Sequence, residues 1–239
     1  MIKSFLYRNF PSLSIRLRDI IKYGYEPEMN FLSKIPHQGY NAVDVGAHLG
    51  NWTYKMSKLF DNVYSFEPNI FLSDLLYNSN LKNVIVHNIA LSSNSGFAEL
   101  NLPVVNDVVR FGNASLSSIN NFIFDHQITQ PVKLNTLDFY QLENVSFIKI
   151  DVEGHELNVL KGAFITISTS LPIMIIEINN SSIDTINSIL DVLGELFYKP
   201  YFLNKNIKLS PWSQGQLSPS SNYIFISSIS KINSSVLIN

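Results

Sequence analysis

The stretch VDVGAHLGNWT at residues 43–53 constrains the fold more than any other part of the chain. A short apolar run ends at Val45, Gly46 permits a tight turn close to a ligand, and Gly50 permits close packing where a helix begins. This strand–turn–helix order is typical of nucleotide-binding α/β proteins. The motif departs from G-x-G-x-x-G because His48 stands in place of the middle glycine, and a Gly-x-x-x-Gly turn alone occurs in many α/β proteins.

The rest of the chain alternates between β-rich runs and segments with helical periodicity. Strands are predicted at residues 42–45, 63–66, 84–91, 147–150, 172–178, 201–203 and 223–227, and helices at 51–60, 71–77, 156–165 and 183–196. Continuous apolar runs such as residues 173–176 fit strands that are covered on both faces. The sequence therefore predicts an α/β, Rossmann-like fold, with a mostly parallel seven-stranded sheet and helices on both faces.

Two regions depart from this alternation. Residues 1–38 are predicted to be a helical lead-in, interrupted at Pro11, Pro27 and Pro36, before a single domain at residues 39–239. Residues 92–138 are predicted to be an insertion, with strands flanking a stretch rich in Gly, Asn and Ser. Such an insertion is either a lid or binding loop, or a plain excursion of the scaffold.

Composition excludes several classes of function. The formal net charge is −2 and no long basic run is present, so we expect no nucleic-acid partner. The chain has no cysteine, which excludes disulfides, thiolate metal sites and a cysteine nucleophile. We find neither an apolar run of the roughly 20 residues that a membrane span needs nor a signal peptide. These features lead us to expect a cytoplasmic protein.

The N-terminal segment mixes basic and apolar residues. Arg8, Arg16, Arg18 and Lys22 could contact an anionic membrane surface, so peripheral membrane contact is one interpretation. The alternative, which we favour at this stage, is an ordinary amphipathic helix that packs on the domain.

Acidic residues follow two of the predicted strands. Glu67, in SFEP at residues 65–68, ends the next strand about twenty residues after the glycine turn, where this fold places an acid that binds ribose hydroxyls. Asp151 and Glu153, in FIKIDVEGHE at residues 147–156, lie at the carboxyl end of a strand that Lys149 interrupts. Because unpaired acids are costly at such a position, we interpret Asp151 as functional.

These motifs together resemble the FkbM family of methyltransferases over roughly residues 40–178. In order they are VDVGAHLGNWT at 43–53, SFEP at 65–68, NIALS at 88–92, GNASL at 112–116, TLD at 136–138, IKIDVEGHELNVLKGA at 148–163 and PIMIIEI at 172–178. The DVEG stretch followed by VLKGA is the most specific part. The glycine turn is shared with many other methyltransferases.

The resemblance implies a class I methyltransferase fold that binds S-adenosylmethionine and methylates a hydroxyl of a sugar, a glycan or a small natural product. It also implies the roles of individual residues, which we state as expectations. Asp44, Gly46, Ala47 and Gly50 would surround the methionine part, Glu67 would hold the ribose, Asn88 and Ala90 would lie near the adenine, and Asp151 and Glu153 would lie between cofactor and acceptor.

The base that removes the hydroxyl proton has three candidates, Asp151, Glu153 and His155, of which Asp151 has the best position. A divalent metal is a second possibility, because Asp151 and Glu177 end what we predict to be neighbouring strands and Asn179 follows. We favour a site without metal, because paired acids at strand ends also occur without an ion.

Two other classes of function stay open. A dinucleotide-dependent oxidoreductase would share Gly46, Gly50 and Glu67, although the missing middle glycine and the DVEG segment disfavour it. A non-catalytic relative could keep the same fold as a binding module. The sequence predicts neither the acceptor nor the oligomeric state.

Overall fold

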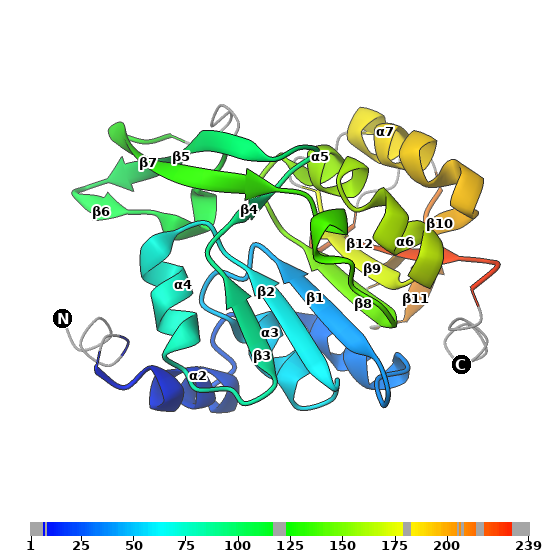
Figure 1. The fold of residues 1–239 in the computed structure, drawn as a ribbon, viewed down its shortest axis with the longest axis horizontal. Coiled ribbons are helices and arrows are strands. Elements are labelled where there is room, and N and C mark those ends of the chain that lie inside the picture. Colours follow the sequence, from blue (N-terminus) through cyan, green and yellow to red (C-terminus); the bar gives the residue numbers. More distant parts are fainter. Residues whose placement is uncertain are drawn as a thin grey trace.

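The computed structural model describes residues 7, 9–116, 123–178, 183–204, 206, 208–213 and 218–230. Its main sheet has eight strands in the order β11-β10-β12-β9-β8-β1-β2-β3 (Figure 1). They are β1 (Asn41–Val45), β2 (Asn62–Phe66), β3 (Val84–His87), β8 (Val145–Ile150), β9 (Ile173–Glu177), β10 (Tyr198–Leu203), β11 (Leu209–Pro211) and β12 (Asn222–Ser227). The five strands from β3 to β9 are parallel, and the pairings of β12, β10 and β11 are antiparallel.

The predicted α/β class is confirmed, but the sheet has eight strands where seven were predicted. The additional strand is β11, which pairs antiparallel with β10 from Leu209 to Pro211. Three residues are too few to show an alternating pattern, and Pro211 lacks the N–H that a central strand would need. The sequence therefore gave no signal for this edge strand.

Helices cover both faces of the sheet. The 3-10 helix η1 (Pro27–Lys34) and α3 (Asn51–Ser57) pack on one face, where Trp52 and Met56 contact Phe147 and Ile175 in one apolar cluster. On the other face, α5 (Glu156–Lys161), α6 (Phe164–Ser170) and α7 (Ile183–Leu193) bury their apolar residues against the alternate side chains of the same strands. This two-sided burial explains the continuous apolar runs in the strands.

Two further α-helices lie at the β3 edge of the sheet (Figure 1). They are α2 (Pro11–Ile20) and α4 (Ile70–Tyr77). Pro11 and Pro27 occupy the first residues of α2 and η1, where the missing N–H costs no helical hydrogen bond. Among the described residues, no helix is both long and apolar enough to cross a bilayer.

A second sheet lies beyond the carboxyl ends of the parallel strands (Figure 1). Its order is β4-β7-β5-β6, formed by β4 (Ala90–Leu91), β5 (Gly96–Val105), β6 (Val108–Val109) and β7 (His126–Asn135). The strands predicted on either side of the stretch rich in Gly, Asn and Ser correspond to β5 and β7, which form a long antiparallel pair. A short 3-10 helix, η2 (Phe111–Asn113), follows β6. This small sheet positions one wall of the site.

Candidate active site

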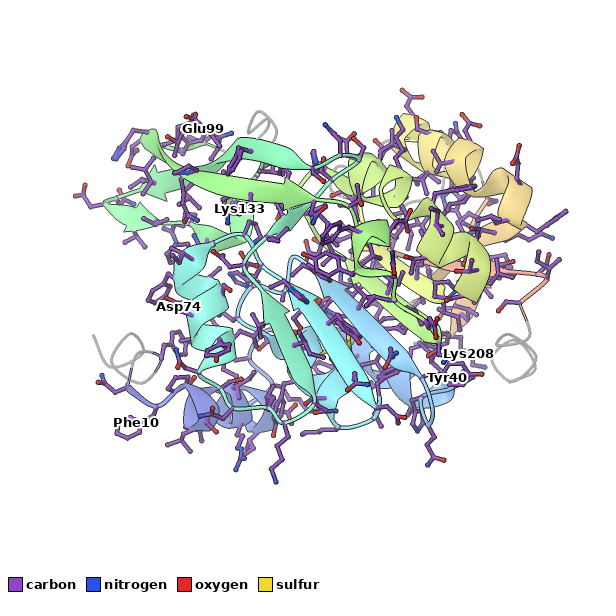
Figure 2. All side chains as sticks on the ribbon, viewed as in Figure 1. Phe10, Tyr40, Asp74, Glu99, Lys133 and Lys208 are labelled. Carbon is purple, nitrogen blue, oxygen red and sulfur yellow. The ribbon has the colours of Figure 1, made fainter. Side chains whose placement is uncertain are left out.

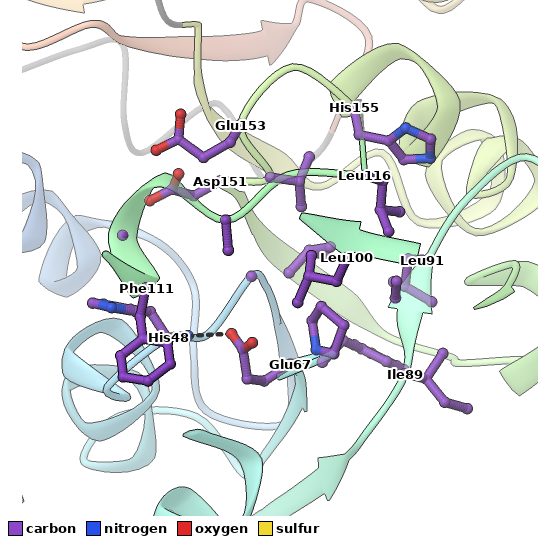
Figure 3. Close-up of a pocket in the computed structure, with 18 of the residues that line it drawn as sticks. His48, Glu67, Ile89, Leu91, Leu100, Phe111, Leu116, Asp151, Glu153 and His155 are labelled. Atoms are coloured by element: carbon purple, nitrogen blue, oxygen red, sulfur yellow. Dashed lines mark hydrogen bonds between the residues drawn. The ribbon is translucent and has the colours of Figure 1, made fainter. Parts of the chain in front are cut away.

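A cavity of about 220 Å³ lies between the carboxyl ends of the parallel strands and the small sheet (Figure 3). We call the strand-end side the floor; it consists of Val45, Gly46, His48, Phe66, Glu67, Pro68, Asp151, Val152, Glu153, His155 and Glu177. We call the other side the roof; it consists of Ile89, Ala90, Leu91, Leu100, Phe111, Gly112, Ala114 and Leu116. The predicted insertion thus forms part of the cavity wall.

The two glycines of the first motif have different surroundings. Gly46 has φ of +81°, and a Cβ atom there would lie 1.8 Å from the backbone oxygen of Asp151. Gly46 therefore allows the β1 turn to contact the DVEG turn directly. Gly50 also has a positive φ, of +80°, but its absent Cβ makes room for Leu76 and Ile15 of neighbouring helices. Gly50 is not among the residues that line the cavity, so its contribution is helix packing.

Glu67 is held in place by the backbone of two turns. Its Oε2 atom accepts a hydrogen bond from the His48 amide at 2.7 Å, and its Oε1 atom accepts one from the Asn69 amide at 2.8 Å (Figure 3). Burial raises the pKa of this carboxyl to about 7, although both amides lower it in part. Each oxygen keeps a second lone pair, which suits a ligand with two neighbouring hydroxyls.

Asn88 and Ala90, both predicted near an adenine, have different positions. The Asn88 side-chain amide donates to the carbonyl oxygens of Glu67 and Pro68, at 2.9 Å each. It supports the turn that carries Glu67 and does not line the cavity. Ala90 is in the roof and does line it.

The buried lysine of β8 lies between the acids at the strand ends. The Lys149 Nζ atom is 3.9 Å from Oδ2 of Asp151, 3.8 Å from Oε2 of Glu177, and donates to Oδ1 of Asn222 at 3.0 Å. Burial lowers the pKa of Lys149, but the charges of the surrounding acids more than offset this and raise it above its usual value. Burial, and then the charge of Asp151, raise the pKa of Glu177 to about 8. The cluster therefore carries one ammonium and at least one proton on its acids near neutrality.

A second, smaller cavity of about 60 Å³ lies on the other side of the glycine turn. It shares Gly46, His48 and Asp151 with the first cavity, and its other lining residues are Glu26, Asp44, Ala47, Leu49, Asn51, Trp52 and Lys149. Asp44 is buried and accepts a hydrogen bond from the Thr53 hydroxyl at 2.5 Å. Burial raises the pKa of Asp44 to about 6, partly offset by the Thr53 hydroxyl. The predicted residues Asp44 and Ala47 belong to this smaller cavity.

Glu26 is a site residue that sequence reasoning missed. Its carboxylate accepts hydrogen bonds from Trp52 Nε1 at 2.9 Å and from the Asn222 side-chain amide at 2.8 Å. It lies in the lead-in, 18 positions before Asp44. Because no motif surrounds it, only the folded chain shows that it joins the acids near Lys149.

His155 and Glu153 connect the floor to the roof. The Nε2 atom of His155 is 3.0 Å from the Ser92 hydroxyl, and its Nδ1 atom is 3.2 Å from the Asn158 side-chain amide. With both ring nitrogens engaged, His155 is less suited than Asp151 to accept a proton. The Glu153 carbonyl accepts a hydrogen bond from the Ser115 hydroxyl at 2.6 Å. Asp151 therefore stays the best-placed candidate base.

The metal hypothesis concerned Asp151, Glu177 and Asn179. Asn179 is outside the described residues, and the described part of the chain contains no group of three or more His, Cys, Asp or Glu side chains that could hold a metal ion. The ammonium of Lys149 lies near both acids, at the distances given above. The cluster thus has a cation of its own.

The charge of the larger cavity is one-sided. Its described lining residues include four carboxylate side chains, those of Glu67, Asp151, Glu153 and Glu177, and neither lysine nor arginine. Burial lowers the pKa of His48 and that of His155, which favours their neutral forms. The cavity therefore favours a ligand with positive charge and hydroxyl groups.

This strand order, with a glycine turn after β1 and an acid at the end of β2, defines the fold of class I S-adenosylmethionine-dependent methyltransferases. The methyltransferase FkbM domain matches residues 44–200, and the chain belongs to the FkbM methyltransferase family. No curated protein matches the sequence.

The fold is similar to that of a solved FkbM methyltransferase. Methyltransferase FkbM from Methylobacillus flagellatus aligns with a TM-score of 0.53 and 16% identity, over 94% of this chain and 57% of that one. The chain thus spans a little over half of that relative's length. An S-adenosylmethionine-dependent O-methyltransferase from Thermotoga maritima aligns with a TM-score of 0.46 and 12% identity, over 87% of this chain and 68% of that one. A protein from Streptococcus mutans in complex with SAH aligns with a TM-score of 0.43 and 14% identity, over 83% of this chain and 93% of that one.

Proposed function

We propose that the protein is an S-adenosylmethionine-dependent O-methyltransferase acting on a hydroxyl of a sugar, a glycan or a small natural product. The observation that carries this proposal is the acidic cavity at the glycine turn. S-adenosylmethionine carries a sulfonium and an α-ammonium, which the carboxylates attract. A dinucleotide carries a pyrophosphate, which the same carboxylates repel.

The residues around the glycine turn fit the cofactor. Glu67 offers two fixed oxygens to the ribose hydroxyls. Asp44, Gly46 and Ala47 line the smaller cavity, whose acids suit the α-ammonium of the methionine part. Ala90 and its apolar neighbours in the roof offer a surface for the adenine. When bound, the cofactor supplies the methyl group.

The acid cluster supports a hydroxyl acceptor. A hydroxyl needs a base to take its proton as the oxygen gains the methyl group, and Asp151 faces the cavity from the floor. The Lys149 ammonium lies between this carboxylate and Glu177, with its Nζ atom 3.9 Å from Oδ2 of Asp151 and 3.8 Å from Oε2 of Glu177. Asp151 is accordingly the proposed base, with Glu153 beside it as a residue that positions the acceptor.

The roof supports a small acceptor with an apolar face. Leu100, Phe111 and Leu116 contribute apolar side chains, and Phe111 stacks on Phe71 with ring centroids 5.7 Å apart. A sugar ring presents C–H groups on one face and hydroxyls at its edge. Such a ring can pack against the roof while one hydroxyl points at Asp151.

Binding of S-adenosylhomocysteine measured by titration calorimetry tests this proposal. We expect micromolar affinity, and we expect Glu67→Gln to lose about 10- to 100-fold, because a hydrogen bond to a charged group is worth about 1.5–3 kcal/mol. Glu99→Gln, an exposed acid in the small sheet, is the matched control and should bind like the unaltered protein (Figure 2).

Two outcomes would replace the proposal. No binding by the folded protein, together with binding of NAD, would assign it to the oxidoreductases. Binding of S-adenosylhomocysteine by a protein whose biological effect survives Asp151→Asn would assign it to the non-catalytic relatives.

A further inference from the structure

The outward face of α2 is apolar. Leu13, Leu17 and Ile20 repeat at helical spacing, and their exposed fractions are 48%, 38% and 74%. Phe10 and Ile21 extend this stripe at its two ends, with 50% and 68% exposed. Figure 2 labels Phe10, whose ring projects from the surface. An amphipathic helix on a globular domain ordinarily turns such a stripe toward the core. Here the helix packs on the domain through its other face, and the apolar stripe faces solvent.

The inward face of α2 explains this orientation. Ser14, Ile15 and Arg18 are buried. The Arg18 guanidinium donates to the carbonyl oxygen of Leu49 and, at 3.2 Å, to the side chain of Asn51. The helix is therefore fixed to the glycine turn by its arginine, and its apolar stripe can only point away from the domain.

The rim of this stripe is positively charged. Arg16 is exposed on the helix, Lys22 is exposed just after it with its ammonium 5.4 Å from the centroid of the Tyr25 ring, and Asp19 is the only acid between residues 9 and 24. Its carboxylate is bound by Lys55 at 2.5 Å and by Lys58 at 2.7 Å, so this group of three carries a net positive charge. The rim is thus basic on a chain whose formal net charge is −2.

We propose that the α2 face, defined as Phe10, Leu13, Arg16, Leu17, Ile20 and Lys22, docks on an anionic phospholipid membrane. An apolar stripe with a basic rim is the pattern of helices that lie in the membrane interface. A second copy of the chain is disfavoured as the occupant, because pairing two such faces would bring two basic rims together. Docking would place the lipid surface on the outer side of α2, whose inner side is bonded to the glycine turn by Arg18.

Co-sedimentation of the full chain with phospholipid vesicles tests the proposal. We expect binding to vesicles of phosphatidylcholine mixed with phosphatidylglycerol, weaker binding to phosphatidylcholine alone, and weakening by added salt. Leu17→Ser with Ile20→Ser, and separately Arg16→Glu with Lys22→Glu, should each lower the partition coefficient by about tenfold.

Matched controls lie on helices elsewhere. Ile165→Ser replaces another exposed isoleucine and Lys161→Glu another exposed lysine, and neither should change vesicle binding. Thermal unfolding and S-adenosylhomocysteine binding verify that each variant is folded, and they report on the proposed function independently of the membrane. The proposal would be overturned if both double variants bound vesicles as well as the unaltered protein does, or if the unaltered protein showed no preference for anionic vesicles. A dimer in sedimentation velocity that Leu17→Ser dissociates would assign the face to a second copy.

Discussion

The floor and the roof of the cavity differ in how their side chains are held. The floor carries acids whose partners are backbone amides or a buried lysine, as Glu67 and Asp151 show. The roof contributes apolar side chains such as Leu100, from a small cluster separate from the core of the main sheet. The floor is thus built from the main sheet, whereas much of the roof belongs to the separate small sheet.

This difference separates two tasks. The floor must present charges in fixed positions, which requires that each buried charge has a partner. The roof must cover the cavity and fit a particular acceptor, which apolar side chains can do with few constraints on their neighbours. We therefore expect changes in the floor to affect stability and cofactor binding, and changes in the part of the roof formed by Leu100, Phe111 and Leu116 to affect the acceptor.

The largest effect should come from removing the cation of the floor. Lys149→Met keeps most of the apolar stem of the side chain but leaves Asp151 and Glu177 without their buried partner. The charge of Asp151 is then uncompensated, but its side chain is 31% exposed, so we expect the free energy of unfolding to fall by about 3 kcal/mol, the low end for a broken buried pair, measured by urea denaturation. Lys161→Met, on an exposed surface, should change it by less than about 0.5 kcal/mol. A loss of under about 1 kcal/mol at Lys149 would show that the floor does not depend on this charge.

A smaller loss of stability should distinguish two reasons for glycine at the glycine turn, namely close contact with the Asp151 backbone and a positive φ angle. Gly46 and Gly39 have nearly equal φ angles, of +81° and +79°. A methyl group at Gly46 meets the Asp151 backbone, whereas one at Gly39 meets no atom within 4 Å. We expect Gly46→Ala to destabilise the protein by about 2 kcal/mol more than Gly39→Ala, and to weaken S-adenosylhomocysteine binding as well. Equal losses of unfolding free energy would mean that only φ matters there.

The sequence predicted the floor well because its residues carry local signals. A glycine turn after an apolar run indicated where β1 ends, and acids after apolar runs singled out Glu67 and Asp151. The main sheet followed from the same alternation of strands and helices. In the main sheet the edge strand β11 was missed, because three residues show no periodicity. The single strand predicted at residues 84–91 is in fact two, β3 in the main sheet and β4 in the small one.

The roof residues, the neighbour of Gly50 and the acid Glu26 had no such local signals in the sequence. Leu100 and Leu116 are ordinary apolar residues in sequence, and only the position of the small sheet brings them to the cavity. The sequence shows that Gly50 must be small, but it cannot show that the neighbour is Leu76 rather than a ligand. Glu26 reaches the acid cluster through tertiary contacts alone.

The smallest effect on the fold should come from the roof. Phe111→Ala removes an aromatic side chain that lines the cavity and stacks on Phe71. We expect a stability loss of about 1 kcal/mol, since both rings keep partial exposure, and S-adenosylhomocysteine affinity within about threefold of the unaltered protein. For an acceptor found by screening methyl transfer, KM should rise by about tenfold, because apolar contact with the ring is lost. Phe97→Ala, an exposed aromatic of the same sheet outside the cavity, should leave all three quantities unchanged. If Phe111→Ala instead weakened S-adenosylhomocysteine binding by more than about tenfold, Phe111 would belong to the cofactor site together with Ala90, and this part of the roof would not be set apart for the acceptor.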